Sequence, residues 1–304
     1  MTGVVLNEDL SRTSLIFIYA AMAIYTFAFI TFVWHLSRLS SEKKKVRKSA
    51  DVLEKAGLWM LGIAAATHGT GVVMRGIAAS RVPWANMYEF SISGSFIIVA
   101  IFLGALVVRD IRVIATFVSG FALLVLGAAT TLFYVQVKTL MPALQSYWLV
   151  IHVTVAVLAT SFFFIAAALS IAYLFAQAKW VNNGKGNITK LIRRVLSVFP
   201  KPKKMERLSY RFNVIGMILW TFTLIAGAIW AQKAWHRFWG WDTKEVWTFI
   251  IWTIYAGYAH ARATRGWDGA RAAWLSVVGF VAVMFNFTIV NLFFKGLHVY
   301  SGLK

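Results

Sequence analysis

Eight long apolar runs dominate the chain. They cover residues 13–36, 56–79, 91–108, 113–134, 148–178, 209–231, 246–262 and 273–294. A helix that crosses a bilayer needs about 20 predominantly apolar residues, and these runs fall in or above that range. None alternates in the manner of a barrel strand, so each must satisfy its backbone hydrogen bonds as a helix. The pattern predicts an all-α polytopic membrane protein with about eight transmembrane helices, in which residues 1–304 form a single integral membrane domain.

Basic residues gather in alternate loops. The segments 37–55, 109–112, 179–211 and 261–272 hold 22 of the 31 lysines and arginines. Cytoplasmic loops carry an excess of Lys and Arg, so these loops are predicted to be cytoplasmic and both termini to lie on the outer side. Residues 179–208 then form a basic cytoplasmic loop. The net charge of +20 is thereby explained by topology and contact with anionic membrane lipid, and no nucleic acid partner is expected.

The amino-acid composition excludes several classes of protein and of site chemistry. Hydrophobic residues make up 60% of the chain and charged residues 14%, which excludes an ordinary soluble protein and a disordered one. The chain has no cysteine, which excludes disulfides, thiolate metal sites and a cysteine nucleophile. There is no P-loop, no Gly-rich dinucleotide turn and no visible Ser-His-Asp arrangement. We therefore expect no residue of this chain to act as a nucleophile.

A tryptophan-rich loop at residues 232–247 lies between the sixth and seventh runs, on the predicted outer side; we call it the tryptophan loop. Positions 235–247 read WHRFWGWDTKEVW. An interfacial aromatic belt needs only scattered Trp and Tyr, whereas Trp220 and Trp274 lie on helices away from this dense cluster. Such a surface suits a large, flat, apolar ligand that bears a few charged groups. Asp242 and Glu245 fit equally well a role at the start of the next helix, where carboxylates favourably meet the helix dipole.

Two histidines are predicted to share the outer surface with this loop. His152 lies a few residues inside the outer end of the fifth run, and His298 lies just past the end of the eighth. Either one alone could be an ordinary hydrogen-bonded histidine. Two imidazoles that face each other across a flat ring system hold a bis-His haem, and this pair is the candidate for such a site.

The other histidines differ from this pair. His260 is about 27 Å from Asp242 along a helix, near the cytoplasmic face, so it needs another partner or another ligand. His68 has small neighbours typical of helix packing. His35 is expected at the membrane interface, and His236 is expected to face solvent.

The tryptophan loop resembles the WWD signature, WGxxWxWDPKE, of haem-handling membrane proteins. The segment 83–89, the segment 142–152 and the C-terminal GLHxY are similar to the CcsA/ResC subunits of system II cytochrome c synthases. The likeness extends over nearly the whole chain and is closest over residues 230–300. Two departures stand out, because His236 replaces the family's usual Gly and Thr243 replaces its usual Pro. The first leaves open a different loop geometry or an extra ligand at His236, and the second leaves open the turn into the seventh helix.

The resemblance implies a function in cytochrome c maturation. It implies axial ligands to haem iron at His152 and His298, and a transmembrane haem contact at His260 completed by a histidine of the CcsB/ResB subunit. The residues implied to hold the haem face are Trp235, Trp239, Trp241 and Asp242. The complex would act as a lyase that moves haem b outward and joins its vinyl groups to the thiols of a CxxCH apocytochrome c. A thioredoxin-like protein would keep those thiols reduced.

Two other functions are alternatives. The first is a haem exporter without ligation chemistry. The second is a haem-containing electron-transfer subunit, a class that usually places its histidine pairs on facing helices of one bundle. The expected location is the bacterial plasma membrane, with the thylakoid membrane as the alternative.

Overall fold

The computed structural model describes residues 6–39, 44–140, 144–197, 199–294 and 296–297, and within these residues the chain is helical and has no β-strand. The long helices are α1 (Glu8–Leu39), α2 (Lys44–Ala78), α3 (Met87–Val108), α4 (Ala115–Leu132), α5 (Tyr147–Gln177), α8 (Pro202–Trp235), α9 (Thr243–Arg265) and α10 (Gly269–Phe285). The short elements are a 3₁₀ turn (Arg112–Ile114), α6 (Lys179–Asn183), α7 (Asn187–Leu196), a π-helical turn (Asn286–Val290) and α11 (Asn291–Phe293).

The described residues contain seven helices that are long and apolar enough to cross a membrane, which makes this a multi-pass membrane protein. They include every predicted run except 246–262, and they confirm the prediction of an all-α polytopic membrane protein. That run does form a helix, the 23-residue α9. Its Trp, Thr and Tyr side chains dilute the aliphatic ones, which lowers its hydropathy below that of its neighbours.

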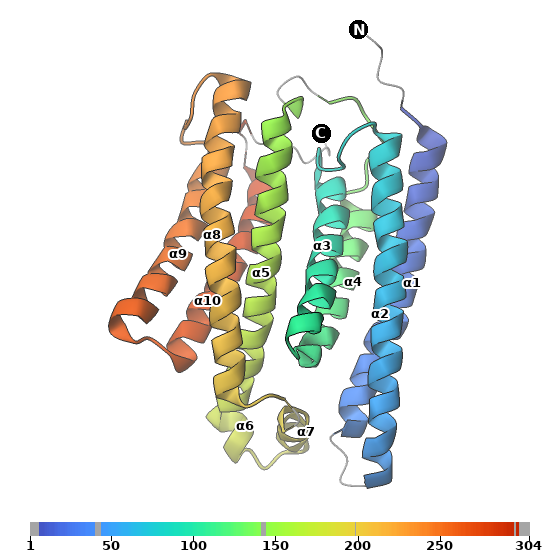
Figure 1. Cartoon of the computed structure of the whole chain (residues 1–304), viewed down its shortest axis with the longest axis vertical. Coiled ribbons are helices and arrows are strands. Elements are labelled where there is room, and N and C mark those ends of the chain that lie inside the picture. The colour runs from blue at the N-terminus through green and yellow to red at the C-terminus, as the bar shows by residue number, and fades with distance from the viewer. Residues whose placement is uncertain (1–5, 40–43, 141–143, 198, 295, 298–304) are drawn as a thin grey trace.

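The loops are sorted to the two ends of the bundle (Figure 1). The ends of α1, α3, α5 and α9, beyond each of which the sequence is rich in Lys and Arg, lie at the lower end of the view. The connections that follow α2, α4 and α8 lie at the upper end, together with the start of α1. This separation is what antiparallel helices with charge-sorted loops require. That the lower end is cytoplasmic stays a prediction of the charge pattern.

The helices form two neighbouring groups. α1 to α4 make the first, α5, α8, α9 and α10 make the second, and α3 packs against α5 where they meet (Figure 1). In the second group, Ser170 and Ser209 are hydrogen-bonded at 2.7 Å, and the Asn213 side chain donates to Ser276 at 2.9 Å. Such bonds join α5 to α8 and α8 to α10, because polar side chains buried among membrane helices need partners on neighbouring helices.

The basic segment 179–208 contains α6, α7 and the first turns of α8. α7 is seen end-on in Figure 1, so it lies across the bundle axis. It exposes apolar Ile188 and Leu191 and carries basic Lys190 and Arg194. This combination is typical of a helix that lies in the headgroup plane of a membrane.

Candidate functional site

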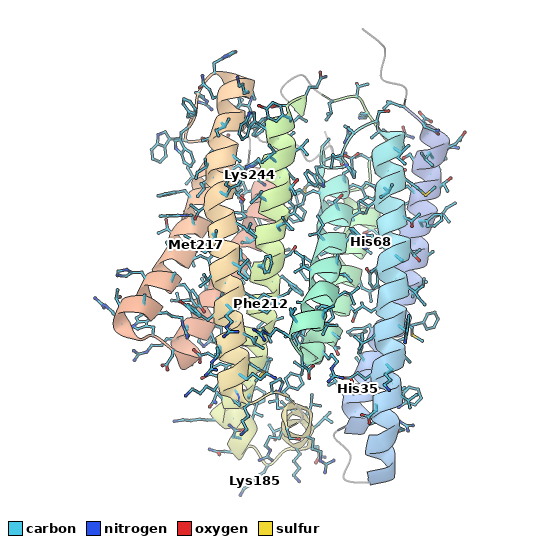
Figure 2. The ribbon with its side chains drawn as sticks, in the orientation of Figure 1. His35, His68, Lys185, Phe212, Met217 and Lys244 are labelled. Carbon is cyan, nitrogen blue, oxygen red and sulfur yellow. The ribbon has the colours of Figure 1, made fainter. Side chains whose placement is uncertain are left out.

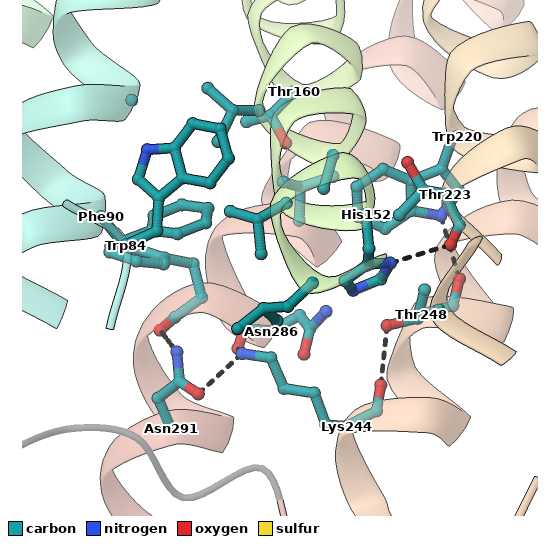
Figure 3. A pocket seen from close by; sticks show the side chains of 18 of the residues that line it. Trp84, Phe90, His152, Thr160, Trp220, Thr223, Lys244, Thr248, Asn286 and Asn291 are labelled. Carbon is teal, nitrogen blue, oxygen red and sulfur yellow. Dashed lines mark hydrogen bonds between the residues drawn. The ribbon is translucent and has the colours of Figure 1, made fainter. Parts of the chain in front are cut away.

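A cavity of about 220 Å³ opens at the upper end, where α3 of the first group faces α5, α8, α9 and α10 of the second. We call it the aromatic cavity, after the rings that line it: Trp84, Phe90, His152, Trp220, Trp230 and Trp239. Trp84 and Phe90 lie on one side, and His152 and Trp220 on the other (Figure 3). The structure therefore brings one predicted histidine and one predicted tryptophan to a single site.

The His152 imidazole is fixed in place from two directions. Its Nδ1 lies 2.9 Å from the backbone oxygen of Thr223, and its ring stacks on Trp230 with centroids 6.0 Å apart and planes at 18°. A carbonyl oxygen can only accept, so Nδ1 carries the proton and, in the neutral ring, Nε2 carries the lone pair. A histidine that ligates a metal is oriented in this way, with its other nitrogen donating to a carbonyl or carboxylate.

Gly227 on α8 makes room for this ring. A Cβ atom at Gly227 would lie 2.8 Å from Cε1 and 2.9 Å from Nδ1 of His152. That is closer than real Cβ contacts, so any side chain at position 227 would displace the imidazole. The absence of a side chain on α8 is thus part of what positions His152.

The four loop residues assigned to the haem face do not lie together. Trp239 lines the aromatic cavity, whereas Trp241 is 77% exposed and meets Trp239 edge-on with centroids 5.8 Å apart. Trp235 packs against Trp230 at 4.8 Å. Trp241 and Trp235 are not among the residues that line the cavity. Asp242 is also outside that lining, and its carboxylate accepts hydrogen bonds from the backbone nitrogens of Lys244 and Leu297.

Trp220 was expected to lie away from the ligand loop, and the structure corrects this. Its side chain is buried and lines the aromatic cavity, and its indole N–H donates to the backbone oxygen of Thr248 at 3.0 Å. Trp274, by contrast, is 59% exposed. Only Trp274 is therefore a suitable comparison for the tryptophans of the cavity.

Asp242 and Glu245 form a capping box at the start of α9. The Glu245 Oε2 atom accepts from the backbone nitrogens of Gly240 at 2.8 Å and Asp242 at 3.1 Å. The Asp242 side chain accepts from the Lys244 backbone nitrogen in return. The structural interpretation of this carboxylate pair holds, because the bonds satisfy backbone donors that a helix start leaves unpaired. The turn is thus closed with Thr243 where the family has Pro.

His236 lies at a position where the backbone is in the left-handed conformation. His236 ends α8 in the left-handed conformation with φ of 59°, and Trp241 has the same φ. Glycine is the residue that adopts this conformation without steric cost. The Gly of the WWD signature would adopt this conformation without strain, whereas His236 adopts it at a steric cost. Its side chain is exposed, as predicted.

A buried ion network supports the opposite wall. Glu89, fully buried at the start of α3, receives hydrogen bonds from Arg75 at 3.1 Å and from Arg81. It also accepts from the Ala85 backbone nitrogen at 3.0 Å. A buried carboxylate needs such partners. Because two arginines and a backbone amide converge on Glu89, the turn that carries Trp84 into the cavity is held in one position.

Lys244 is the site residue that sequence reasoning missed, although the lysine was visible among the aromatic rings. Its side chain lines the aromatic cavity, and its Nζ atom donates to Asn291 Oδ1 at 2.7 Å and to the Asn286 backbone oxygen at 3.1 Å. Burial lowers the pKa of Lys244 to about 7, although the Asp242 carboxylate acts in the opposite direction. Contacts with residues more than 40 positions away leave no local signal in a sequence.

The remaining histidines lie apart from the cavity. His260 is exposed near the lower end of α9, and His298 lies outside the described residues. His68 is buried, with Nδ1 3.3 Å from the Tyr25 hydroxyl, and its ring meets Phe96 edge-on. His35 Nδ1 donates to the Ala50 backbone oxygen and thereby links α1 to α2.

Known proteins resemble this chain over most of its length. A family model described as Cytochrome C assembly protein matches residues 84–298. The cytochrome c biogenesis protein CcsA of Synechococcus elongatus is 34% identical over 264 residues, which cover 75% of this chain and 81% of that protein. The CcsA proteins of Prochlorococcus marinus and Mesostigma viride are 37% and 39% identical over 180 and 175 residues.

The last two alignments cover 57% of each relative, so the matched part spans little more than half of their length. The family match begins at Trp84 and includes the tryptophan loop and the helices that enclose the aromatic cavity. By the extent of that match, and by its similarity to CcsA proteins, the chain belongs to the cytochrome c assembly protein family.

Proposed function

We propose that the protein binds haem in the aromatic cavity, with His152 as an axial ligand of the iron, and presents it for attachment to apocytochrome c. The observation that carries this proposal is the orientation of His152. Its Nδ1–H donates to a carbonyl, so the lone pair for a metal is on Nε2 of a residue that lines an aromatic cavity. Membership of the cytochrome c assembly family supports haem as the ligand.

His298 is the proposed second axial ligand. It lies outside the described residues, but the adjacent Leu297 donates its backbone N–H to Asp242 at 3.0 Å. That bond ties the residue next to His298 to the tryptophan loop. A bis-His site would then have one ligand on α5 and the other on the C-terminal segment.

The cavity would enclose the haem only in part. Its volume of about 220 Å³ is below the roughly 300–1,000 Å³ of pockets that surround a small molecule. A macrocycle ligated by His152 would leave an edge accessible to a CxxCH segment, whose thiols add to the vinyl groups. The chain's own contribution is to hold and orient the haem, and orientation alone supplies several kcal/mol toward such a reaction, on the order of 7 or more in favourable cases.

His260 is proposed as a second haem contact, at the lower end of α9. Its exposure on α9 supports a ligand shared with another membrane subunit, because a histidine on that subunit could approach it from outside the bundle. Haem would pass outward from this contact to the aromatic cavity. We propose CcsB/ResB as this partner, a thioredoxin-like protein as the source of reduced apocytochrome thiols, and the plasma membrane as the location, with the thylakoid membrane as the alternative.

The visible absorption spectrum of the purified protein, alone and with its partner subunit, tests the proposal. His152→Ala should remove the low-spin bis-His features at equal protein abundance, and added imidazole should restore part of them. His236→Asn is the matched control, because it changes an exposed histidine of the tryptophan loop and Asn tolerates the left-handed conformation.

An unchanged reduced spectrum and haem content in His152→Ala would rule out this site. Normal haem binding by a complex that forms no holocytochrome would favour a haem exporter instead.

A further inference from the structure

The aromatic cavity is polar at one end only. Trp84, Phe90 and Trp220 form its apolar walls, whereas α9 and the end of α10 contribute Lys244 and Asn286 (Figure 3). A cavity with this asymmetry fits an amphiphilic ligand, whose flat apolar body would lie among the rings and whose polar substituent would meet α9 and α10.

The ammonium of Lys244 is held at this polar end by two neutral oxygens. Its Nζ atom donates to Asn291 Oδ1 and to the backbone oxygen of Asn286, which uses two of its three N–H groups. Figure 2 shows Lys244 near the upper end of the bundle, and Figure 3 shows its side chain reaching from α9 toward Asn286 and Asn291. These hydrogen-bond partners are neutral, so a ligand anion would add to the attraction that the nearby Asp242 carboxylate exerts on the ammonium.

The backbone around Asn286 is irregular in a way that supports a binding role. Asn286 begins the π-helical turn that separates α10 from α11. Single π turns inside helices are rare and occur frequently at functional sites. Here the turn lies at the cavity, and its first carbonyl accepts a hydrogen bond from Lys244.

Two buried polar atoms at the same end have no partner among the described residues. They are Asn286 Oδ1 and Glu245 Oε1, and both residues line the cavity. Because each atom accepts hydrogen bonds, each needs a water molecule or a ligand donor. The α9 and α10 end of the cavity is therefore polar, with Lys244 as its cation and the Glu245 carboxylate as its anion.

We propose that Lys244, held by Asn286 and Asn291, binds a carboxylate of the ligand and thereby sets which edge of the ligand faces outward. This inference rests on the proposed function, and for haem the carboxylate is a propionate. The two propionates of haem lie on one edge of the macrocycle, so their capture at α9 and α10 directs the vinyl-bearing part away from Lys244. Lys244 would be a positioning residue for the attachment reaction.

The test compares haem with haem dimethyl ester, in which both propionates are blocked. Binding of each to the full-length purified chain is followed by absorbance titration at pH 6.5. The wild type should bind haem about tenfold more tightly than the diester, the size of one charge-assisted contact. Lys244→Met should lose this preference by weakening haem binding while diester binding stays unchanged, and Lys244→Arg should keep the preference. Lys138→Met, which removes an exposed lysine from the connection after α4, is the matched control.

Each outcome has a defined meaning. If the wild type binds neither ligand, the proposed haem site is wrong. If the wild type binds both equally, the carboxylate site is wrong even though the haem site stands, and this comparison needs no variant. If Lys244→Met weakens both ligands equally, Lys244 has only a structural role and the inference is overturned.

Discussion

The Oδ1 atom of Asp242 accepts a hydrogen bond from the backbone nitrogen of Leu297 at 3.0 Å. This bond joins the start of α9 to a segment 55 residues later in the chain. A Cβ atom at Gly296 would lie 2.1 Å from the same oxygen, so the approach depends on a glycine. One carboxylate therefore caps α9 and holds the C-terminal segment beside the tryptophan loop.

Removal of this carboxylate should cost stability and ligand binding together. Asp242→Ala deletes both the cap and the Leu297 contact, and loss of a helix cap costs about 1 kcal/mol. Asp242→Asn keeps an acceptor oxygen and a good cap, so it should unfold and bind haem much like the wild type. The midpoint of thermal unfolding and the haem content would be measured for both. A loss of haem in Asp242→Asn at normal abundance would instead assign the negative charge a direct role near the ligand.

The effect of replacing a tryptophan on haem retention should depend on whether its ring lines the cavity, and not on whether it belongs to the tryptophan loop. Trp239→Ala removes a ring that lines the cavity, and an aromatic side chain buries about 150–250 Å². It should lower haem retention and cytochrome maturation, whereas the exposed Trp241→Ala and Trp274→Ala should change haem retention far less. The haem content per protein, measured at matched expression, distinguishes the Trp239 variant from the other two. Equal retention in all three variants would reduce the loop to an interfacial aromatic belt.

A single methyl group at Gly227 should disturb the iron ligand. Gly227→Ala places an atom within 2.9 Å of the His152 ring, so the imidazole must move from its bond with Thr223. We expect altered axial ligation in the absorption spectrum. Gly257→Ala is the control, because nothing lies within 4 Å of its added Cβ and alanine favours a helix. Identical spectra for the two variants would show that His152 is not held against α8.

His236→Gly should stabilise the protein. A left-handed conformation costs a residue with a side chain about 1–2 kcal/mol, and part of that gain is offset by the greater freedom of glycine in the unfolded chain. The thermal midpoint should therefore rise. Gly266 has the same φ of 59° and open space around it, so Gly266→Ala should lower the midpoint. A fall in the midpoint of His236→Gly would mean that the imidazole contributes more than its backbone conformation costs.

Haem affinity should fall with rising pH above neutrality. The pKa of Lys244 is lowered to about 7 by burial, so below pH 7 the ammonium is present before binding, and above pH 7 it must take up a proton to pair with a carboxylate. This uptake weakens binding progressively above pH 7, by no more than the roughly tenfold that the contact contributes.

His152 lines the same cavity and would ligate haem and its diester alike. The Asp242 and Glu245 carboxylates beside Lys244 would repel the propionates but not the diester, so a variant is needed to assign the pH dependence of the affinity ratio to Lys244. Lys244→Arg should make that ratio independent of pH, because a guanidinium stays charged. A ratio that stays constant for the wild type between pH 6.5 and 9 would contradict the assignment.

Hydrophobic runs located the helices, but not always their ends. The run 148–178 became α5 (Tyr147–Gln177), whereas the run 56–79 is only the later part of α2 (Lys44–Ala78). Length and apolar composition are local properties, and a helix satisfies its own backbone, so these elements needed no knowledge of their neighbours. The same local reading selected His152 and Trp239, which do line one cavity.

The tertiary structure alone decided which side chains share that cavity. Left-handed turns at His236 and Trp241 direct Trp239 inward and leave Trp241 exposed, and no hydropathy pattern records such turns. Lys244 became a cavity residue because α11 brings Asn291 to within 2.7 Å of its ammonium. Contacts between residues tens of positions apart depend on how helices pack, and packing is specified by the whole set of side chains rather than by any one segment.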